Sequence, residues 1–183
     1  MYIQPSTIVL KDGRQALLRC PSVEDASALV DLLRTVYQET DYLMRYPEEM
    51  NITVEQEKVW IENNLSSPYT IMLSCEVEGK IVGNCQIDFN ARLKTKHRAS
   101  LAISIMQAFW GLGIGTAMFQ KMEEEARKHD VSQLELEYIE GNQRGLALYQ
   151  KMGFETVSYK PDAICLKDGT LLKEYFMIKK LRS

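Results

Sequence analysis

The amino-acid sequence predicts a single α/β domain, and three observations lead to this prediction. The chain has 183 residues, which is enough for one sizeable hydrophobic core and too few for two ordinary domains. Stretches of alternating apolar and polar residues, typical of strands, are interspersed with stretches whose apolar residues have helical spacing. A glycine-rich segment, 110–116, joins one of these strands to a helix. We therefore expect one domain over 1–183.

Composition and charge exclude several classes of protein. The formal net charge is only -3 and Lys and Arg are dispersed along the chain, so we expect no nucleic-acid partner. The sequence has no basic stretch followed by an apolar run at its start and no apolar run near the length of a membrane helix, so we expect a cytoplasmic protein with no membrane association. The four cysteines are widely spaced and only two histidines accompany them, which favours neither a disulfide framework nor a metal site.

The spacing of apolar residues places each element. Alternation predicts strands at 7–10, 15–19, 69–77, 81–89, 98–106, 133–138, 154–159 and 171–180. Helical spacing predicts helices at about 26–37, 54–65, 113–129 and 142–152.

Turn and cap residues support the elements of the first half. Asp12-Gly13 favours a tight hairpin turn between the first two strands. Ser22, followed three residues later by Asp25, resembles the start of the first helix. The second helix is expected to stop before Ser66-Ser67-Pro68.

The second half is punctuated in the same way. Glu78-Gly79-Lys80 makes the third and fourth strands a hairpin. The helix that follows the glycine-rich segment carries its cations at 127–129, near its C-terminus, where the helix dipole favours positive charge. No internal repeat or low-complexity linker interrupts the pattern.

The most informative segment is Trp110-Gly111-Leu112-Gly113-Ile114-Gly115-Thr116. Glycines between a strand and a helix leave backbone N–H groups pointing outward and let a bulky anion approach, which suits a diphosphate. The alternative is that these glycines only permit a tight turn and close helix packing. A dinucleotide-binding fingerprint requires a further Gly or Ala where Thr116 or Met118 stands, and a P-loop requires a lysine that is absent.

The segment resembles the pyrophosphate motif of the GNAT superfamily of N-acetyltransferases, which reads Arg or Gln, two residues, Gly, one residue, then Gly or Ala. The run 110–115 matches this motif except that Trp110 replaces the Arg or Gln. A second set of residues resembles the family's later strand, asparagine, tyrosine and Gly-Phe signature in the expected order. They are 134–137, Asn142, Leu148-Tyr149 and Gly153-Phe154, so the specific signals lie within 101–154.

The resemblance implies a fold and an activity. The implied fold is a mixed, mostly antiparallel central sheet with helices on both faces and a splayed pair of parallel strands. The implied activity is acetyl-CoA-dependent N-acetylation of a primary amine, on a small molecule or on a peptide or protein, by direct transfer in a ternary complex. The alternative is a non-catalytic acetyl-CoA-binding regulatory module. Relatives often pair through their C-terminal strands, so a homodimer is also implied.

The resemblance also assigns residues to the cofactor. The strand end would bond to the pantetheine arm, the glycine turn and the start of its helix to the pyrophosphate, and an asparagine and a tyrosine to the arm and the thioester. These residues are Ile105, Met106, Gln107, Gly111, Leu112, Gly113, Ile114, Gly115, Thr116, Ala117, Met118, Asn142 and Tyr149. An asparagine just before a helix also serves as an N-cap, which is the structural alternative for Asn142.

Catalytic and acceptor residues follow in the same way. Tyr149 resembles the tyrosine that protonates the leaving thiolate. Many relatives carry a glutamate on the strand before the glycine turn, whereas 100–104 has no carboxylate, so Glu137 on the next strand is the candidate base. The connection 39–49 is rich in carboxylates and favours a cationic amine. The residues expected to face this acceptor are Glu39, Asp41, Arg45 and Glu174.

Overall fold

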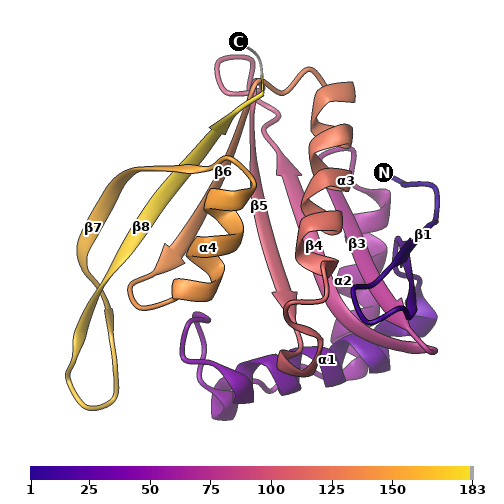
Figure 1. Ribbon diagram of the computed structural model, residues 1–183, viewed down its shortest axis with the longest axis horizontal. Coiled ribbons are helices and arrows are strands. Elements are labelled where there is room, and N and C mark those ends of the chain that lie inside the picture. Colours follow the sequence, from indigo (N-terminus) through magenta and orange to yellow (C-terminus); the bar gives the residue numbers. More distant parts are fainter. Residues whose placement is uncertain (182–183) are drawn as a thin grey trace.

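The computed structural model describes residues 1–181 and contains one mixed sheet with the strand order β1-β2-β3-β4-β5-β6-β8-β7 (Figure 1). The strands are β1 (Ser6–Val9), β2 (Gln15–Arg19), β3 (Thr70–Val77), β4 (Lys80–Phe89), β5 (Arg98–Ile105), β6 (Gln133–Ile139), β7 (Glu155–Cys165) and β8 (Leu171–Lys180). The α-helices are α1 (Ala26–Glu39), α2 (Val54–Ser66), α3 (Ile114–Lys128) and α4 (Gln143–Lys151). Short 3-10 helices are η1 (Val23–Asp25), η2 (Pro47–Glu49) and η3 (Gln107–Phe109).

Neighbouring strands run antiparallel except for β5 and β6, which are parallel. This pair is hydrogen-bonded only where Arg98–Ser100 faces Gln133–Glu135. Beyond that point β5 stays paired with β4 as far as Ile105, and β6 stays paired with β8 as far as Ile139. The two strands therefore separate, and Figure 1 shows a wedge between them. The expected mostly antiparallel sheet with a splayed parallel pair is confirmed.

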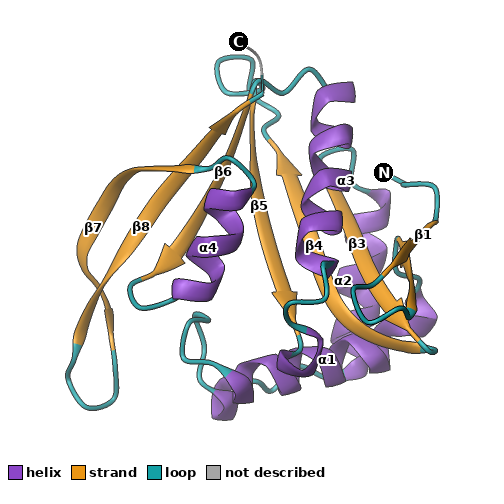
Figure 2. Ribbon diagram, viewed as in Figure 1, coloured by secondary structure: helices purple, strands orange, loops and turns teal. Residues whose placement is uncertain are grey.

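Helices cover both faces of the sheet, as expected (Figure 2). One layer of the core joins α1 and α2 to β3 and β4, through residues such as Leu32, Ile61 and Met72. The other joins α3 and α4 to the opposite face, through residues such as Met118 and Tyr149. β3 is buried on both faces and alternates between these two layers. Among the described residues, no helix combines the length and apolar character needed to cross a membrane.

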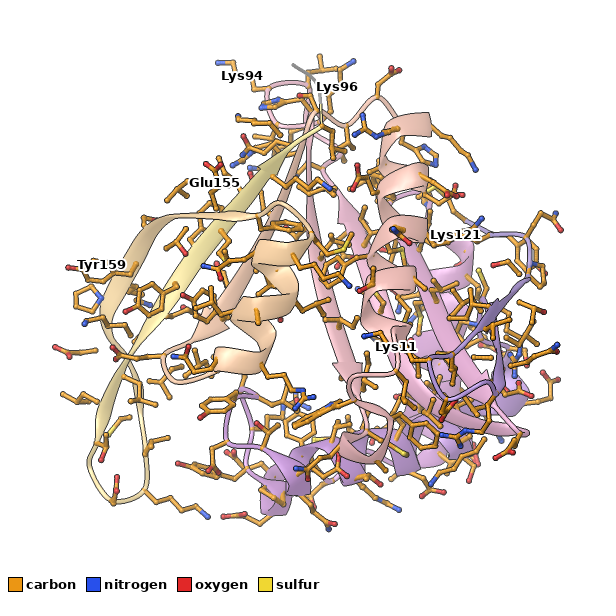
Figure 3. All side chains as sticks on the ribbon, viewed as in Figure 1. Lys11, Lys94, Lys96, Lys121, Glu155 and Tyr159 are labelled. Atoms are coloured by element: carbon orange, nitrogen blue, oxygen red, sulfur yellow. The ribbon has the colours of Figure 1, made fainter. Side chains whose placement is uncertain are left out.

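The last hairpin differs from the prediction. β7 extends to Cys165, whereas alternation predicted a strand that ends at Tyr159. The strand continues past Pro161 because β7 lies at the edge of the sheet, where proline's missing N–H removes no ladder bond. The register with β8 shifts between Lys160 and Ile164, which accommodates the proline. Tyr159 points outward from this edge and is 58% exposed (Figure 3).

A cluster of charges ties the N-terminal hairpin to the start of α1. The Arg19 guanidinium donates to Asp25 at 2.6 Å and to Glu76 at 2.8 Å. Asp25 also accepts the Ser22 N–H at 2.7 Å, as expected for a capped helix start. The hydrogen bonds from Arg19 lower the pKa of the Asp25 carboxyl below its usual value. Because a lowered pKa stabilises the fold only while the group is ionised, this contribution exists above about pH 4 and is lost as pH falls through the lowered pKa.

We predict that Asp25→Asn, which keeps the shape and removes the charge, lowers the free energy of unfolding by about 1–2 kcal/mol at pH 7. The difference from the wild type should shrink as pH falls below about 4, because Asp25 of the unfolded wild type is protonated first and Asp25 of the folded protein follows at its lowered pKa. Urea unfolding at pH 7 and pH 3 measures both values. Asp31→Asn, at an exposed position on α1, is the matched control and should stay within about 0.5 kcal/mol of wild type at both pH values. Equal stability of Asp25→Asn and wild type at pH 7 would show that the Asp25 charge does not stabilise the fold.

Candidate cofactor and acceptor site

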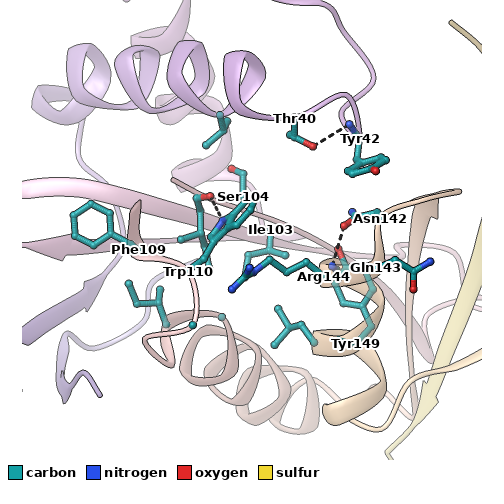
Figure 4. Close-up of a pocket in the computed structure, with 18 of the residues that line it drawn as sticks. Thr40, Tyr42, Ile103, Ser104, Phe109, Trp110, Asn142, Gln143, Arg144 and Tyr149 are labelled. Atoms are coloured by element: carbon teal, nitrogen blue, oxygen red, sulfur yellow. Dashed lines mark hydrogen bonds between the residues drawn. The ribbon is translucent and has the colours of Figure 1, made fainter. Parts of the chain in front are cut away.

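The wide end of the β5–β6 wedge opens into a cavity of about 500 Å³ (Figure 4). Its walls come from the end of α1 and the segment that follows it, from β5, from the glycine turn and α3, and from the β6–α4 turn with α4. Eight of the residues expected to bind the cofactor line it. They are Ile105, Gly111, Gly113, Ile114, Gly115, Thr116, Asn142 and Tyr149.

The glycine turn presents unpaired backbone donors to this cavity. Gly113 is the N-cap of α3 and has a φ of 100°. Residues other than glycine rarely adopt this left-handed backbone conformation. No side chain caps the helix, and its first turn contains no acidic residue. The first N–H groups of a helix have no intrahelical acceptor, so those of Ile114, Gly115 and Thr116 are available at the positive end of the helix dipole. The turn fits a phosphate-containing group.

Close helix packing, the alternative reading of these glycines, also holds, but at a different position. A Cβ on Gly115 would lie 2.8 Å from Leu148 Cδ2, so the absent side chain lets α3 approach α4. A Cβ on Gly113 would have no atom within 4 Å, and only its backbone conformation requires glycine. The two glycines therefore have separate roles, one in the turn and one in placing α4.

The end of β5 uses its backbone groups in an unexpected way. The Ile105 carbonyl accepts the Trp110 indole N–H at 2.7 Å, and the Met106 N–H donates to the Val82 carbonyl at 2.9 Å. The next amide, Gln107 N–H, donates to Glu39 Oε2 at 2.7 Å. The N–H of Met106 therefore faces β4 rather than the wedge. The amide held by a side chain at the cavity is that of Gln107.

The remaining residues expected at the cofactor lie beside the cavity lining, in the part of the chain that the structure describes. Met118 is a residue of α3 and is fully buried in the core. Ala117 donates its N–H to the Gly113 carbonyl and continues the helix. Leu112 packs against the core and accepts the Lys11 N–H at 3.1 Å, which anchors the β1–β2 turn to the glycine turn.

Asn142 caps α4 and also faces the cavity. Its Oδ1 accepts the Gly145 N–H at 2.9 Å, so the structural alternative of an N-cap is realised. Its side-chain N–H₂ group remains at the cavity wall, where a ligand can accept from it. A Cβ on Gly145 would lie 2.7 Å from Asn142 Nδ2, so glycine at this position leaves room for the asparagine side chain.

Tyr149 lies deep in the wedge and is 9% exposed. Its ring packs edge-on against Phe119, with centroids 5.8 Å apart, and against Tyr138 at 6.3 Å. Burial raises the pKa of its hydroxyl to about 12. Within residues 1–181 no group hydrogen-bonds to this hydroxyl, which leaves its proton free to be donated into the cavity.

The expected acceptor residues divide into two groups. Glu39 lines the cavity and, among the described residues, is the one carboxylate that does so. Asp41 and Arg45 are exposed on the following segment and lie outside the lining. In that segment Tyr42 packs over Gly141, whose Cβ would meet the tyrosine hydroxyl at 3.2 Å, and so closes the cavity on this side.

Glu137 and Glu174 occupy neighbouring strands and also lie outside the lining, within the described chain. Glu137 is exposed on the sheet surface. Its pKa is raised, first by partial loss of hydration and then by the nearby negative charge of Glu174. The two carboxylates are near enough to each other to interact, and neither lines the cavity that Tyr149 lines.

Sequence reasoning missed the cations of the site. Lys11, Arg144 and Lys151 line the cavity although they belong to the β1–β2 turn and to α4. Lys151 Nζ donates to Thr116 Oγ1 at 3.0 Å, beside the first turn of α3. Their spacing in the sequence gives no signal, because only the fold brings the β1–β2 turn and α4 to the same glycine turn.

The splayed strands, the uncapped helix start and the buried tyrosine define a class of protein: acetyltransferases that take the acetyl group from coenzyme A. The chain belongs to the acetyltransferase (GNAT) family, whose sequence model matches residues 29–154.

Individual relatives agree with this assignment. The L-amino acid N-acetyltransferase AaaT of Escherichia coli is 23% identical over 135 residues, which cover 73% of this chain and 83% of AaaT. The structure is similar to a GNAT-family acetyltransferase of Streptococcus pneumoniae, with a TM-score of 0.83, 27% identity, and coverage of 91% of this chain and 99% of that one. It also resembles YncA of Salmonella typhimurium, a putative acetyltransferase solved with its cofactor acetyl-CoA, with a TM-score of 0.78, 18% identity, and coverage of 92% and 95%.

The cofactor of this family is acetyl-CoA, and the cavity fits it. The uncapped N–H groups at Ile114–Thr116 suit the pyrophosphate, and the wedge suits the pantetheine arm. Asn142 and Tyr149 line the same cavity.

We predict that two variants of Asn142 separate its roles. Asn142→Asp keeps an oxygen that caps α4, so the thermal midpoint should not fall, while loss of the amide donor should weaken CoA binding about tenfold. Asn142→Ala should weaken CoA binding and also lower the free energy of unfolding by about 1 kcal/mol. Titration calorimetry with CoA and thermal unfolding measure the two effects. If Asn142→Asp binds CoA as tightly as the wild type, Asn142 acts only as a helix cap and does not bind the cofactor.

Proposed function

We propose that this protein is an N-acetyltransferase that moves an acetyl group directly to a primary amine in a ternary complex. The observation that carries the proposal is the arrangement within one cavity of an anion-binding turn, the protonated hydroxyl of Tyr149 and the carboxylate of Glu39. Bound acetyl-CoA supplies the acetyl thioester, whose thiolate leaves as the new amide forms. The residues of the chain bind, orient and move protons.

Tyr149 is the proton donor to the leaving sulfur in this proposal. A pKa of about 12 keeps the hydroxyl protonated at pH 7–9, so the acid form is present throughout that range. Its ring is held by Phe119 and Tyr138, which limits the directions in which the hydroxyl can point.

Glu39 is proposed to hold the acceptor amine and to take its proton. A primary amine is a cation at neutral pH and must lose a proton before it can attack. Glu39 is the last residue of α1 and precedes Thr40, which Figure 4 shows across the cavity from Tyr149, and we take this side as the one from which an acceptor enters. Glu137, the candidate from the sequence, lies on the sheet surface outside this cavity and is the weaker proposal.

The acceptor side has a second wall. The tip of the β7–β8 hairpin reaches the segment after α1, where Lys167 donates its N–H to the Tyr46 hydroxyl at 3.0 Å and its ammonium pairs with Glu48. This contact ties the hairpin to the acceptor-side segment. Because the relative AaaT acts on L-amino acids, amino acids are the first acceptors to test, followed by small amines and peptides. A non-catalytic acetyl-CoA-binding module is the alternative, and it predicts CoA binding with no turnover of any amine.

A homodimer through the C-terminal strands is part of the proposal. β7 is an edge strand, and its Val157 and Tyr159 are 50% and 58% exposed. An edge with unpaired backbone groups and exposed apolar side chains suits pairing with a second copy. The cytoplasmic location stays a prediction from the sequence.

We predict that Tyr149→Phe lowers kcat by about 100-fold or more, because it removes the proton donor and keeps the ring contacts. The Kd of CoA should change less than threefold. Thiol release with the best amine from a screen gives kcat, and calorimetry gives the Kd. Unchanged kcat would remove Tyr149 from the mechanism, and absence of turnover in the wild type with all amines would favour the binding module.

We predict that Glu39→Gln lowers kcat/KM for a cationic amine by about 10- to 100-fold at pH 7. Glutamine keeps an oxygen that accepts the Gln107 N–H, so the fold of the strand end should persist and CoA affinity should stay near that of the wild type.

Two comparisons test the assignment of Glu39. The loss should be smaller for a weakly basic amine that is already unprotonated at pH 7, because only the proton released as the amide forms has to leave its nitrogen, whereas a cationic amine must first lose its ammonium proton as well. Asp31→Asn, also on α1 and exposed, should have wild-type kcat/KM with both amines. An equal loss with both amines would exclude Glu39 as the group that removes the ammonium proton before attack.

A further inference from the structure

Position 110 is where this chain departs from the family motif, since a tryptophan stands where the motif has Arg or Gln. In the structure, Trp110 stabilises the turn. Its indole N–H donates to the Ile105 carbonyl at 2.7 Å, across the turn that joins β5 to α3. The side chain thus closes the turn and satisfies the end of the strand. It brings no positive charge to the phosphate site.

A cation reaches the same place from another element. Arg144, in the first turn of α4, lies with its guanidinium carbon 4.8 Å from the centroid of the Trp110 ring (Figure 4). One of its terminal nitrogens, Nη2, lies 3.7 Å from the position that a Cβ on Gly111 would take. Within the described residues no carboxylate pairs with Arg144. A guanidinium that stacks on an aromatic ring keeps its N–H groups in its own plane, directed away from the stack. Two of these N–H groups can then donate to one phosphate.

The surroundings support a phosphate at this position. Lys11 and Lys151 line the same cavity, and the second already donates to Thr116 in the first turn of α3. Figure 3 shows Lys11 beside the start of α3. The lining carboxylate, Glu39, comes from α1 and is hydrogen-bonded to the Gln107 N–H. The positive charges therefore gather at the glycine turn.

We propose that Arg144, positioned by the Trp110 ring, is the phosphate-binding cation of this protein and replaces the Arg or Gln that the motif places at position 110. The proposal rests on the proposed cofactor site and adds residues to it. Trp110 is a positioning residue, and Arg144 binds the cofactor's phosphates directly. The affinity for CoA then depends on α4 as well as on α3.

The test is calorimetric binding of CoA to the purified protein, with pantetheine as a phosphate-free probe. Arg144→Gln should raise the Kd of CoA by about 10- to 100-fold, as expected for loss of charge-assisted hydrogen bonds. Its affinity for pantetheine should be that of the wild type. In turnover, KM for acetyl-CoA should rise by the same factor while kcat stays within twofold. Lys94→Gln removes one positive charge from the opposite end of the molecule (Figure 3) and should leave both affinities unchanged.

Variants at position 110 test the positioning role. Trp110→Phe keeps the ring and loses the indole donor, whereas Trp110→Leu loses both, so Trp110→Leu should weaken CoA binding more. In the Arg144→Gln background, Trp110→Arg restores a cation at the motif position and should recover most of the lost affinity. The thermal midpoint of each variant identifies any that is unfolded.

The outcomes separate this proposal from the proposed function. The wild type binds CoA under both proposals. If the Kd of Arg144→Gln for CoA is within twofold of the wild-type Kd, the role of Arg144 is overturned and the acetyltransferase proposal stands. An equal loss of affinity for pantetheine would show that Arg144 supports the wedge rather than the phosphates, which also overturns it. Absence of CoA binding by the wild type would overturn the cofactor site itself.

Discussion

The separation of β5 from β6 is the constraint on which the site depends. Backbone N–H and C=O groups removed from a ladder must find other partners or face solvent. In this chain β5 keeps β4 as its partner and β6 keeps β8, so the facing edges of β5 and β6 lose each other beyond Ser100 and Glu135. The Trp110 indole N–H donates to the Ile105 carbonyl at the end of β5, and Glu39 accepts the Gln107 N–H just beyond it. The rest of the gap is the cavity. The wedge is therefore a consequence of strand pairing, and its depth is limited by the short parallel contact.

The two helices that close the wedge depend on each other through Gly115. Because this residue has no side chain, Leu148 packs directly against the start of α3, and α4 lies close enough for Tyr149 to enter the core beside Phe119. The same α4 begins at Asn142, which caps it. The groups proposed to bind the cofactor and to donate a proton thus share one short helix, whose position is set by packing against α3. A change in the glycine turn would be transmitted to Tyr149 through this contact.

Periodicity in the sequence was sufficient to predict the helices and strands, but it was insufficient to predict where some of them end. The hairpins and the four helices lie where alternation, helical spacing and turn residues predicted them. β7 was predicted too short, because Pro161 ends a strand anywhere except at an edge, and the edge position depends on the whole sheet. The parallel pairing of β5 with β6 came from family resemblance alone, since strand partners far apart in sequence leave no periodic signal. Glu39 was predicted from charge together with Asp41, yet of the two only Glu39 lines the cavity, because charge in the sequence does not tell which side chains of the segment face inward.

Charge is distributed along the cavity in a way that suits the two substrates of an acetyl transfer. Lys11, Arg144 and Lys151 stand near the helix N-terminus, where the α3 dipole adds to their attraction for phosphates. Glu39, the lining carboxylate, comes from α1 and accepts the Gln107 N–H, and its negative charge attracts a cationic amine. The neutral ring of Trp110 lies between the turn and the end of β5, so it can fix the backbone there without adding charge. Arg144 belongs to α4 and Glu39 to α1, so the charged groups of the cavity come from two helices that lie far apart in the sequence.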